Sequence, residues 1–189
     1  MLISFTGAQS TGKTTVLDKM LNTERYATWN YVEEVTRLVK REWHVDINES
    51  GDDNTQMLIM CQHIHNLIKH KTSVDPVLIP TVLDRCIVDC LIYSRYLHSH
   101  GRIRFETLNM CDNIYNNIIN DIDVIFYTHP DDVQLIVDDE RSGNENFRED
   151  IIQEYDMWLK QFTGNVVILR GDVDTRFKQI EDEIIKFNI

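Results

Sequence analysis

The chain has 189 residues, 42% of them hydrophobic, and carries 31 acidic against 19 basic side chains, a formal net charge of -12. This size fits a single domain over residues 1–189 and leaves little room for a second one. The negative charge disfavours a long nucleic acid as partner, because the surface as a whole repels a polyanion. No signal peptide and no run of about eighteen apolar residues is found, so we expect a cytoplasmic protein without a membrane anchor.

The first predicted strand, residues 2–5, runs into a glycine-rich loop and a predicted helix at 13–21. The loop reads G-A-Q-S-T-G-K-T and has the P-loop spacing G-x-x-x-x-G-K-[ST]. Its glycines allow a tight turn in which backbone N–H groups point at nucleotide phosphates. We expect Lys13 to reach phosphate oxygens and Thr14 to ligate Mg²⁺, with the helix N-terminus facing the anion. The residues expected to bind the nucleotide are Gly7, Gln9, Ser10, Thr11, Gly12, Lys13, Thr14 and Thr15.

The second predicted strand, residues 29–32, is followed by Glu33 and Glu34 and by a predicted helix at 34–43, in which Arg37 lies one turn beyond Glu34. Two carboxylates and an arginine at the end of a strand suit the binding of an acceptor hydroxyl. Glu34 could take its proton or fix its position, and Arg37 could neutralise a phosphate. Glu34 is preferred to Glu33 because Arg37 lies one helical turn after Glu34. A helix with an acidic first turn and an i, i+3 ion pair would explain the same residues.

After a predicted helix at 54–71, the third strand at 77–83 leads to Asp84 and Arg85 and to a helix at 87–99. Ligands of parallel α/β sheets gather at the carboxyl ends of strands, so both side chains should lie beside the P-loop. Asp84 could hold Mg²⁺ or orient the attacking group. Arg85 could bind an acceptor phosphate or the transferred phosphoryl group. The alternative is a surface ion pair that caps the next helix.

The fourth strand is predicted at 124–127 and leads into a charged stretch at about 129–148 that is long enough for a mobile lid. Arg141 and Arg148 flank its flexible tip and could swing onto the phosphates, excluding water and stabilising the transition state. They could also simply balance the acidic side chains around them. The remaining predicted elements are helices at 105–120, 146–162 and 174–187 and a strand at 166–169.

Each predicted strand is followed by a segment of helical periodicity. This alternation predicts an α/β fold, a P-loop NTPase three-layer sandwich with a five-stranded parallel sheet and a lid segment.

These motifs resemble those of the small P-loop kinases of nucleosides and nucleotides, a group that includes thymidylate kinases, deoxynucleoside kinases and the nicotinamide riboside kinase type. E-V-T-R at 34–37 is similar to the E-x-x-R after the second strand of that family, and D-R-C-I-V-D-C-L-I-Y at 84–93 to the D-R-Y segment of thymidylate kinases. V-D-D-E-R at 137–141 resembles the lid of the nicotinamide riboside kinase type, and R-G-D at 170–172 suits the loop that contacts adenine.

The resemblance covers most of the chain. It implies that the P-loop binds ATP-Mg²⁺ and that Arg141 or Arg148 closes over the transferred group. It also implies that Glu34, Arg37 and Arg85 hold the acceptor.

The leading hypothesis is therefore an ATP- and Mg²⁺-dependent phosphotransferase of nucleotide metabolism that acts on a small nucleoside or nucleotide. Arg37 and Arg85 together favour a nucleoside monophosphate. The base, the sugar and a possible homodimer stay open. The candidate catalytic residues are Lys13, Glu34, Asp84, Arg85, Arg141 and Arg148, and the candidate metal ligands are Thr14 and Asp84.

Two other classes of function stay open: a kinase acting on a 5′ end or modified base of a nucleic acid, and a non-catalytic ATP-binding regulator. A GTPase is disfavoured because no [NT]-K-x-D motif follows the fourth strand. An AAA-type ATPase is disfavoured because Arg85, and not a second acid, follows Asp84.

Overall fold

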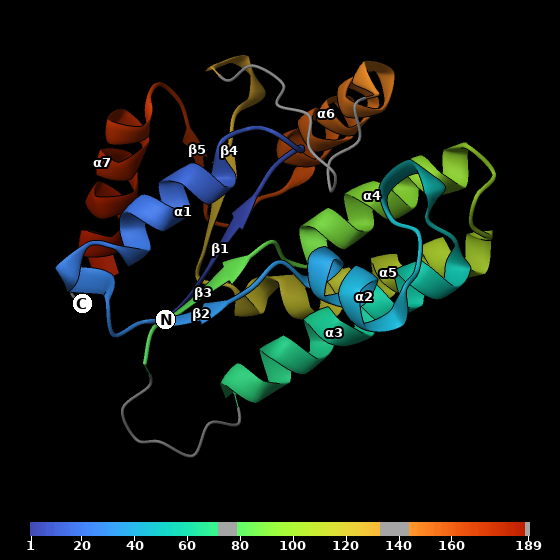
Figure 1. The fold of residues 1–189 in the computed structure, drawn as a ribbon, viewed down its shortest axis with the longest axis horizontal. Helices are drawn as coiled ribbons and strands as arrows, with labels where there is room; N and C mark the ends of the chain where they lie inside the picture. The colour runs from blue at the N-terminus through green and yellow to red at the C-terminus, as the bar shows by residue number, and fades with distance from the viewer. Residues whose placement is uncertain (72–78, 133–143, 188–189) are drawn as a thin grey trace.

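The computed structural model describes residues 1–71, 79–132 and 144–187, and a sheet of five parallel strands runs through its centre (Figure 1). The strand order across the sheet is β2-β3-β1-β4-β5. The apolar runs form these strands because a parallel sheet with helices on both faces buries the side chains of both faces. The strands are β1 (Leu2–Thr6), β2 (Asn30–Val32), β3 (Thr81–Asp84), β4 (Val124–Thr128) and β5 (Val166–Leu169).

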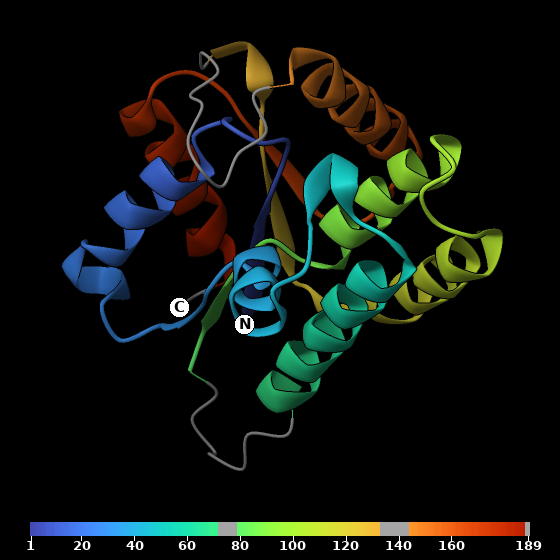
Figure 2. The ribbon, with the colours of Figure 1, turned by 45° about the vertical axis from the view of Figure 1, so that its right-hand side comes forward.

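Helices cover both faces of the sheet, which confirms the predicted three-layer sandwich (Figures 1 and 2). Ile3 and Phe5 of β1 pack with α1 and α7 on one face, and Leu2 packs with the other helices on the opposite face. The helices are α1 (Lys13–Leu21), α2 (Val35–Trp43), α3 (Asp53–Lys71), α4 (Ile87–Ser99), α5 (Phe105–Ile118), α6 (Glu145–Gln161) and α7 (Val173–Ile184). Among the described residues, none of these helices is long and apolar enough to cross a membrane.

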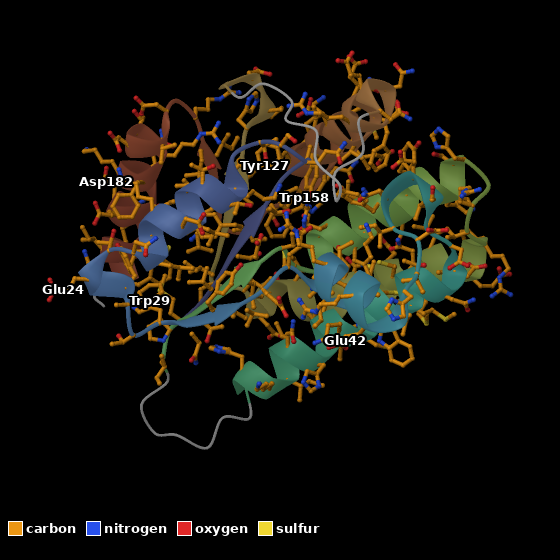
Figure 3. All side chains as sticks on the ribbon, in the orientation of Figure 1. Glu24, Trp29, Glu42, Tyr127, Trp158 and Asp182 are labelled. Carbon is orange, nitrogen blue, oxygen red and sulfur yellow. The ribbon has the colours of Figure 1, made fainter. Side chains whose placement is uncertain are left out.

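The core under α6 is rich in aromatic side chains. Tyr127 and Trp158 are buried there, whereas Glu24, Glu42 and Asp182 are exposed (Figure 3). The indole N–H of Trp158 donates to the hydroxyl of Tyr115 at 2.7 Å, so this large side chain is buried without an unsatisfied donor.

The carboxyl ends of β1 and β3 form the crevice in which the site lies. After β1 the chain enters α1 on one face, and after β3 it enters α4 on the other, which is the arrangement that opens a ligand crevice in α/β sheets. The two ends are level because Phe5 pairs with Asp84, and the N–H of Arg85 donates to the carbonyl of Phe5 at 2.9 Å. The P-loop and Arg85 therefore leave the sheet side by side.

All predicted strands and helices are present, and the boundaries differ by more than one residue in three places. The third strand begins at Thr81 and not at 77, because Pro80 has no N–H to give to a sheet; residues 72–78 lie outside the described ranges. The helices predicted to reach 120 and 187 both end earlier and continue as 3₁₀ turns, Ile119–Asp121 and Ile185–Phe187.

The end of the predicted lid lies in α6, in agreement with the helix predicted from 146, so the lid boundary at 148 is placed too far along the chain. The side chain of Asn144 accepts a hydrogen bond from the N–H of Phe147 at 3.2 Å and so caps α6, which starts at Glu145. Arg148 therefore lies in a helix. Arg141 lies outside the described residues.

Candidate active site

The P-loop curls around the ammonium group of Lys13. The Nζ atom donates to the carbonyl oxygens of Gly7 at 2.8 Å and Ala8 at 2.7 Å. Gly7, Ser10 and Gly12 have positive φ angles of 138°, 55° and 84°, which turn the chain tightly enough for this. A Cβ atom at Gly7 would lie 2.7 Å from the Thr128 hydroxyl and 2.9 Å from its carbonyl oxygen, so the close approach of β4 requires glycine.

Lys13 is buried in this loop, with 6% of its surface exposed. Burial, and after it the positive charge of Arg85, lower the pKa of Lys13 to about 7. Negative phosphates placed in the loop would favour the charged ammonium form. Proton uptake by Lys13 should therefore accompany nucleotide binding.

Arg85 crosses the crevice from the end of β3 and joins the elements of the site. Its Nε donates to Glu34 Oε1 at 2.7 Å, and its Nη1 donates to Asp89 Oδ1 at 2.6 Å and to the carbonyl oxygen of Gly7 at 3.3 Å. Its φ of 73° is a left-handed conformation that costs a non-glycine residue about 1 to 2 kcal/mol. With 8% of Arg85 exposed, the alternative of a surface ion pair is wrong.

Glu34 sits at the start of α2 and pairs with two arginines. Its second oxygen, Oε2, forms an ion pair with Nε of Arg37 at 2.9 Å. Burial opposes its ionisation, but the charges of Arg85, Lys13 and Arg37 outweigh burial and lower the pKa of Glu34. Glu33 instead pairs with Arg41 at 2.8 Å on an exposed surface, so the structure brings Glu34 and not Glu33 to the crevice.

Asp84 and Thr14 offer the carboxylate and the hydroxyl that a Mg²⁺ ion with bound phosphates commonly uses. Asp84 is buried at the end of β3, and the hydroxyl of Tyr31 donates to its Oδ2 at 3.2 Å. Burial and then the charge of Glu34 raise the pKa of Asp84, against the opposing charges of Arg85 and Lys13. Thr14 and Thr15 are exposed in the first turn of α1. These donors fit the expected ion.

Asp89 is a residue of the site that sequence reasoning missed. Its Oδ1 accepts from Arg85 and from the Tyr155 hydroxyl at 2.7 Å, and its Oδ2 accepts from the Thr6 hydroxyl at 2.8 Å and the Cys86 N–H at 3.0 Å. The carboxylate thus fixes Arg85 and begins α4 at the same time. A signal was present, because Asp89 lies one helical turn after Arg85 at the third position of a predicted helix.

A small pocket of about 20 Å³, partly open to solvent, lies beside this network. Its lining comes from α2, α3 and α4 and carries one guanidinium, that of Arg85, against two carboxylates. The lining residues are Glu34, Thr36, Asn48, Gln56, Ile59, His63, Arg85, Asp89, Cys90 and Tyr93. Burial, aided by the charge of Arg85 and opposed by that of Asp89, lowers the pKa of His63 to about 4, so its ring is neutral at pH 7.

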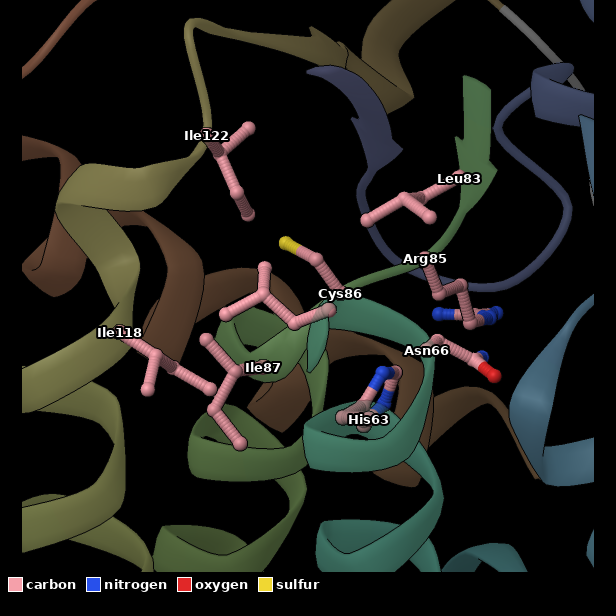
Figure 4. Close-up of a pocket in the computed structure, with 9 residues that line it drawn as sticks. His63, Asn66, Leu83, Arg85, Cys86, Ile87, Ile118 and Ile122 are labelled. Atoms are coloured by element: carbon pink, nitrogen blue, oxygen red, sulfur yellow. The ribbon is translucent and has the colours of Figure 1, made fainter. Parts of the chain in front are cut away.

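A second, more apolar pocket of about 10 Å³ shares Arg85 and His63 with the first one (Figure 4). Leu83, Cys86 and Ile87 face isoleucines of the opposite wall, Ile118 and Ile122, in this view. These apolar side chains lower the local dielectric constant beside the guanidinium and so strengthen the ion pairs of Arg85.

Arg148 approaches the P-loop from the first turn of α6. Its Nε donates to the carbonyl oxygen of Gln9 at 3.3 Å. Its Nη2 is buried and has no hydrogen-bond partner among the described residues. An unsatisfied buried donor next to an anion-binding loop is consistent with the predicted contact to phosphate.

Residues 2–176 match a protein family described as an AAA domain. The chain belongs to this AAA domain family. No curated protein matches the sequence significantly. The sequence favoured a kinase over an AAA-type ATPase, and the name of the family does not decide between these activities.

Solved structures resemble this AAA domain over nearly its whole length. Deoxyadenosine kinase from M. mycoides, with dCMP product and dCDP bound, has 15% sequence identity and a TM-score of 0.69. The match covers 98% of this chain and 100% of the kinase chain. NadR with NAD and AMP-PNP has 17% identity and a TM-score of 0.70, with 98% of this chain and 48% of that one covered. NadR with NR has 18% identity and a TM-score of 0.69, with 98% and 50% covered. The AAA domain thus spans about half of NadR, and the likeness confirms the predicted P-loop kinase-like fold.

Proposed function

We propose that the protein transfers the γ-phosphoryl group of ATP to a hydroxyl of a small nucleoside. The observation that carries this proposal is the buried network of Glu34, Arg85 and Asp89, which lies between the P-loop and a partly open pocket. A hydrolase needs only water beside the phosphates, whereas the carboxylates and the guanidinium of this pocket suit the hydroxyl of a second molecule. The kinase names of similar folds, deoxyadenosine kinase and NadR bound to NR, support the same class of acceptor.

The P-loop and α6 would hold the donor. Lys13 and Arg148 bring positive charge to the phosphates, and Thr14 and Asp84 would hold Mg²⁺, which neutralises charge on the phosphates when bound. The acceptor hydroxyl would lie between Glu34 and the γ-phosphorus. A new P–O bond forms to that hydroxyl as the bond to the β–γ bridging oxygen breaks, and ADP leaves.

Glu34 is better suited to orient the hydroxyl than to remove its proton early. Its two oxygens form ion pairs with Arg85 and Arg37, and its pKa is lowered by these arginines and Lys13 against the effect of burial, so it is a weak base. This is sufficient because phosphoryl transfer passes through a loose transition state in which the hydroxyl loses its proton late. The main contributions are positioning and charge neutralisation.

The charges favour a nucleoside over the monophosphate that the sequence suggested. The prediction of a monophosphate counted Arg37 and Arg85 as phosphate ligands, but both arginines form ion pairs with Glu34. The pocket lining has one guanidinium against two carboxylates, and His63 is neutral, so a phosphate dianion would be repelled. A hydroxyl and a neutral base fit this lining.

The test is a screen with γ-labelled ATP against a panel of nucleosides and nucleoside monophosphates. We expect label in a nucleoside monophosphate, and a fall of about 100-fold in kcat for Glu34→Gln, because the acceptor hydroxyl is then misplaced. Glu33→Gln is the matched control, since it removes the neighbouring carboxylate, which pairs with Arg41 on the surface. Label found only in inorganic phosphate, or equal activity of the two variants, would overturn the proposal.

A further inference from the structure

Arg176 joins three loops at the carboxyl end of the sheet, although it is not part of any motif discussed above. It lies in the first turn of α7 and is 2% exposed. Its Nε donates to the carbonyl oxygen of Gly171 at 2.9 Å, its Nη1 to that of Thr11 at 2.6 Å, and its Nη2 to that of His129 at 3.0 Å. These carbonyls belong to the loops after β5, β1 and β4. One rigid guanidinium thus fixes the spacing of three loops.

The contact with Thr11 determines which way one peptide group of the P-loop points. In a planar trans peptide, the C=O of one residue and the N–H of the next point in opposite directions. Arg176 draws the Thr11 carbonyl oxygen toward α7, so the N–H of Gly12 must point away from α7. Gly12 is in the left-handed region, φ 84° and ψ 15°, directly before α1, so its N–H belongs to the group that lines a P-loop cradle.

The side chain of Thr11 holds the same peptide group from the other end. Its hydroxyl lies 2.6 Å from the Thr128 hydroxyl and donates to the carbonyl of Ala8 at 2.9 Å. The residue is therefore fixed to β4 by its side chain and to α7 by its carbonyl, which leaves the Thr11 peptide little freedom to flip.

We propose that Arg176 is a positioning residue for the phosphate donor: by holding the Thr11 carbonyl it aims the Gly12 N–H at the phosphates. The ligand class is a polyphosphate chain. The inference rests on the donor half of the proposed function but not on phosphoryl transfer or on the acceptor. It explains why a buried arginine of α7 reaches back to the P-loop across the end of the sheet.

The test follows the Gly12 N–H by NMR while sodium tripolyphosphate is titrated into the full chain. Labelling with ¹³C′-threonine and ¹⁵N-glycine selects only Thr–Gly pairs, of which the sequence has three: Thr6–Gly7, Thr11–Gly12 and Thr163–Gly164. Thr11→Ser identifies the Gly12 signal, because that variant removes the label pair. The Gly164 signal, between α6 and β5, is the internal control.

In the wild type we expect tripolyphosphate to shift the Gly12 signal and to leave Gly164 in place. In Arg176→Met we expect a displaced Gly12 signal before ligand is added and a Kd about ten- to a hundredfold weaker, the range for one hydrogen bond to a charged group. Lys178→Met is the matched control, since it removes one positive charge from an exposed position of the same helix. It should bind tripolyphosphate like the wild type.

Wild-type affinity of Arg176→Met for tripolyphosphate would overturn the inference, as would an equal loss in Lys178→Met, which would indicate charge alone. If Arg176→Met does not fold, Arg176→Lys is used, because the single ammonium group of lysine cannot span three carbonyls. Wild-type affinity of Arg176→Lys for tripolyphosphate would also overturn the inference. Binding of tripolyphosphate by the wild type without any phosphoryl transfer would refute the proposed kinase but leave this inference standing.

Discussion

Replacement of Asp89 by asparagine should lower stability strongly. Asp89 is 4% exposed and accepts four hydrogen bonds, from Arg85, Tyr155, Thr6 and Cys86. In Asp89→Asn the amide NH₂ is tolerated best near the Thr6 hydroxyl, which can turn to accept. The Cys86 N–H then loses its acceptor, which costs about 1–3 kcal/mol, and the bond to Arg85 loses its ionic character, which costs about a further 1–1.5 kcal/mol. The upper part of this range overlaps the about 3–5 kcal/mol typical of breaking a buried ion pair.

For a chain of this size, about 3–5 kcal/mol corresponds to a fall in Tm of about 6–20 °C. Scanning calorimetry measures it. The matched control is Asp182→Asn, an exposed carboxylate paired with Lys178, which should leave Tm within about 2 °C. A fall of under about 3 °C for Asp89→Asn, or equal falls for both variants, would refute the reasoning that Asp89 holds the network together.

Three further predictions concern the donor and acceptor sides. Above about pH 7, MgATP binding should be accompanied by proton uptake and should weaken as pH rises toward 10, because Lys13 has a pKa of about 7 before binding and the phosphates raise that pKa. Calorimetry at pH 8 in two buffers of different ionisation enthalpy should therefore give different binding enthalpies. Equal binding enthalpies in the two buffers would contradict this prediction. Arg148→Met should lower kcat at least about tenfold with a smaller change in ATP affinity, and an unchanged kcat would count against a role at the phosphates. Arg85→Lys keeps the charge but cannot bridge Glu34 and Asp89, so kcat/KM for the acceptor should fall by about 100-fold, and full activity would show that the bridge is dispensable.

Most of the fold could be predicted because its signals are local. Apolar runs gave the strands, and the glycine spacing gave the P-loop together with the strand before it and the helix after it. The start of β3 was wrong because the apolar run continues through Pro80, where sheet hydrogen bonding cannot. The lid boundary at 148 overlapped the helix predicted from 146, because the charged composition of the lid continues past the Asn144 cap into the first turn of α6.

The site was only partly predictable, because several of its contacts join distant parts of the chain. Glu34, Asp84 and Arg85 follow strand ends, so topology alone predicts that they meet. The i, i+3 spacing allowed for the ion pair of Arg37 with Glu34, but nothing local shows that Arg85 would share the same carboxylate, which changes the expected acceptor. Asp89 had a helical-spacing signal, but Arg176 had none, since a buried arginine in a first helical turn has the same sequence pattern as a solvated one.

The central claim is transfer to a nucleoside rather than hydrolysis, and ³¹P NMR of a single reaction mixture tests it most directly. With MgATP and a nucleoside that the protein accepts, the signals of ADP and of a nucleoside monophosphate should grow at the same rate, while inorganic phosphate stays near background. Growth of ADP and inorganic phosphate in equal amounts, with no phosphate monoester formed from any nucleoside of the panel, would contradict the account.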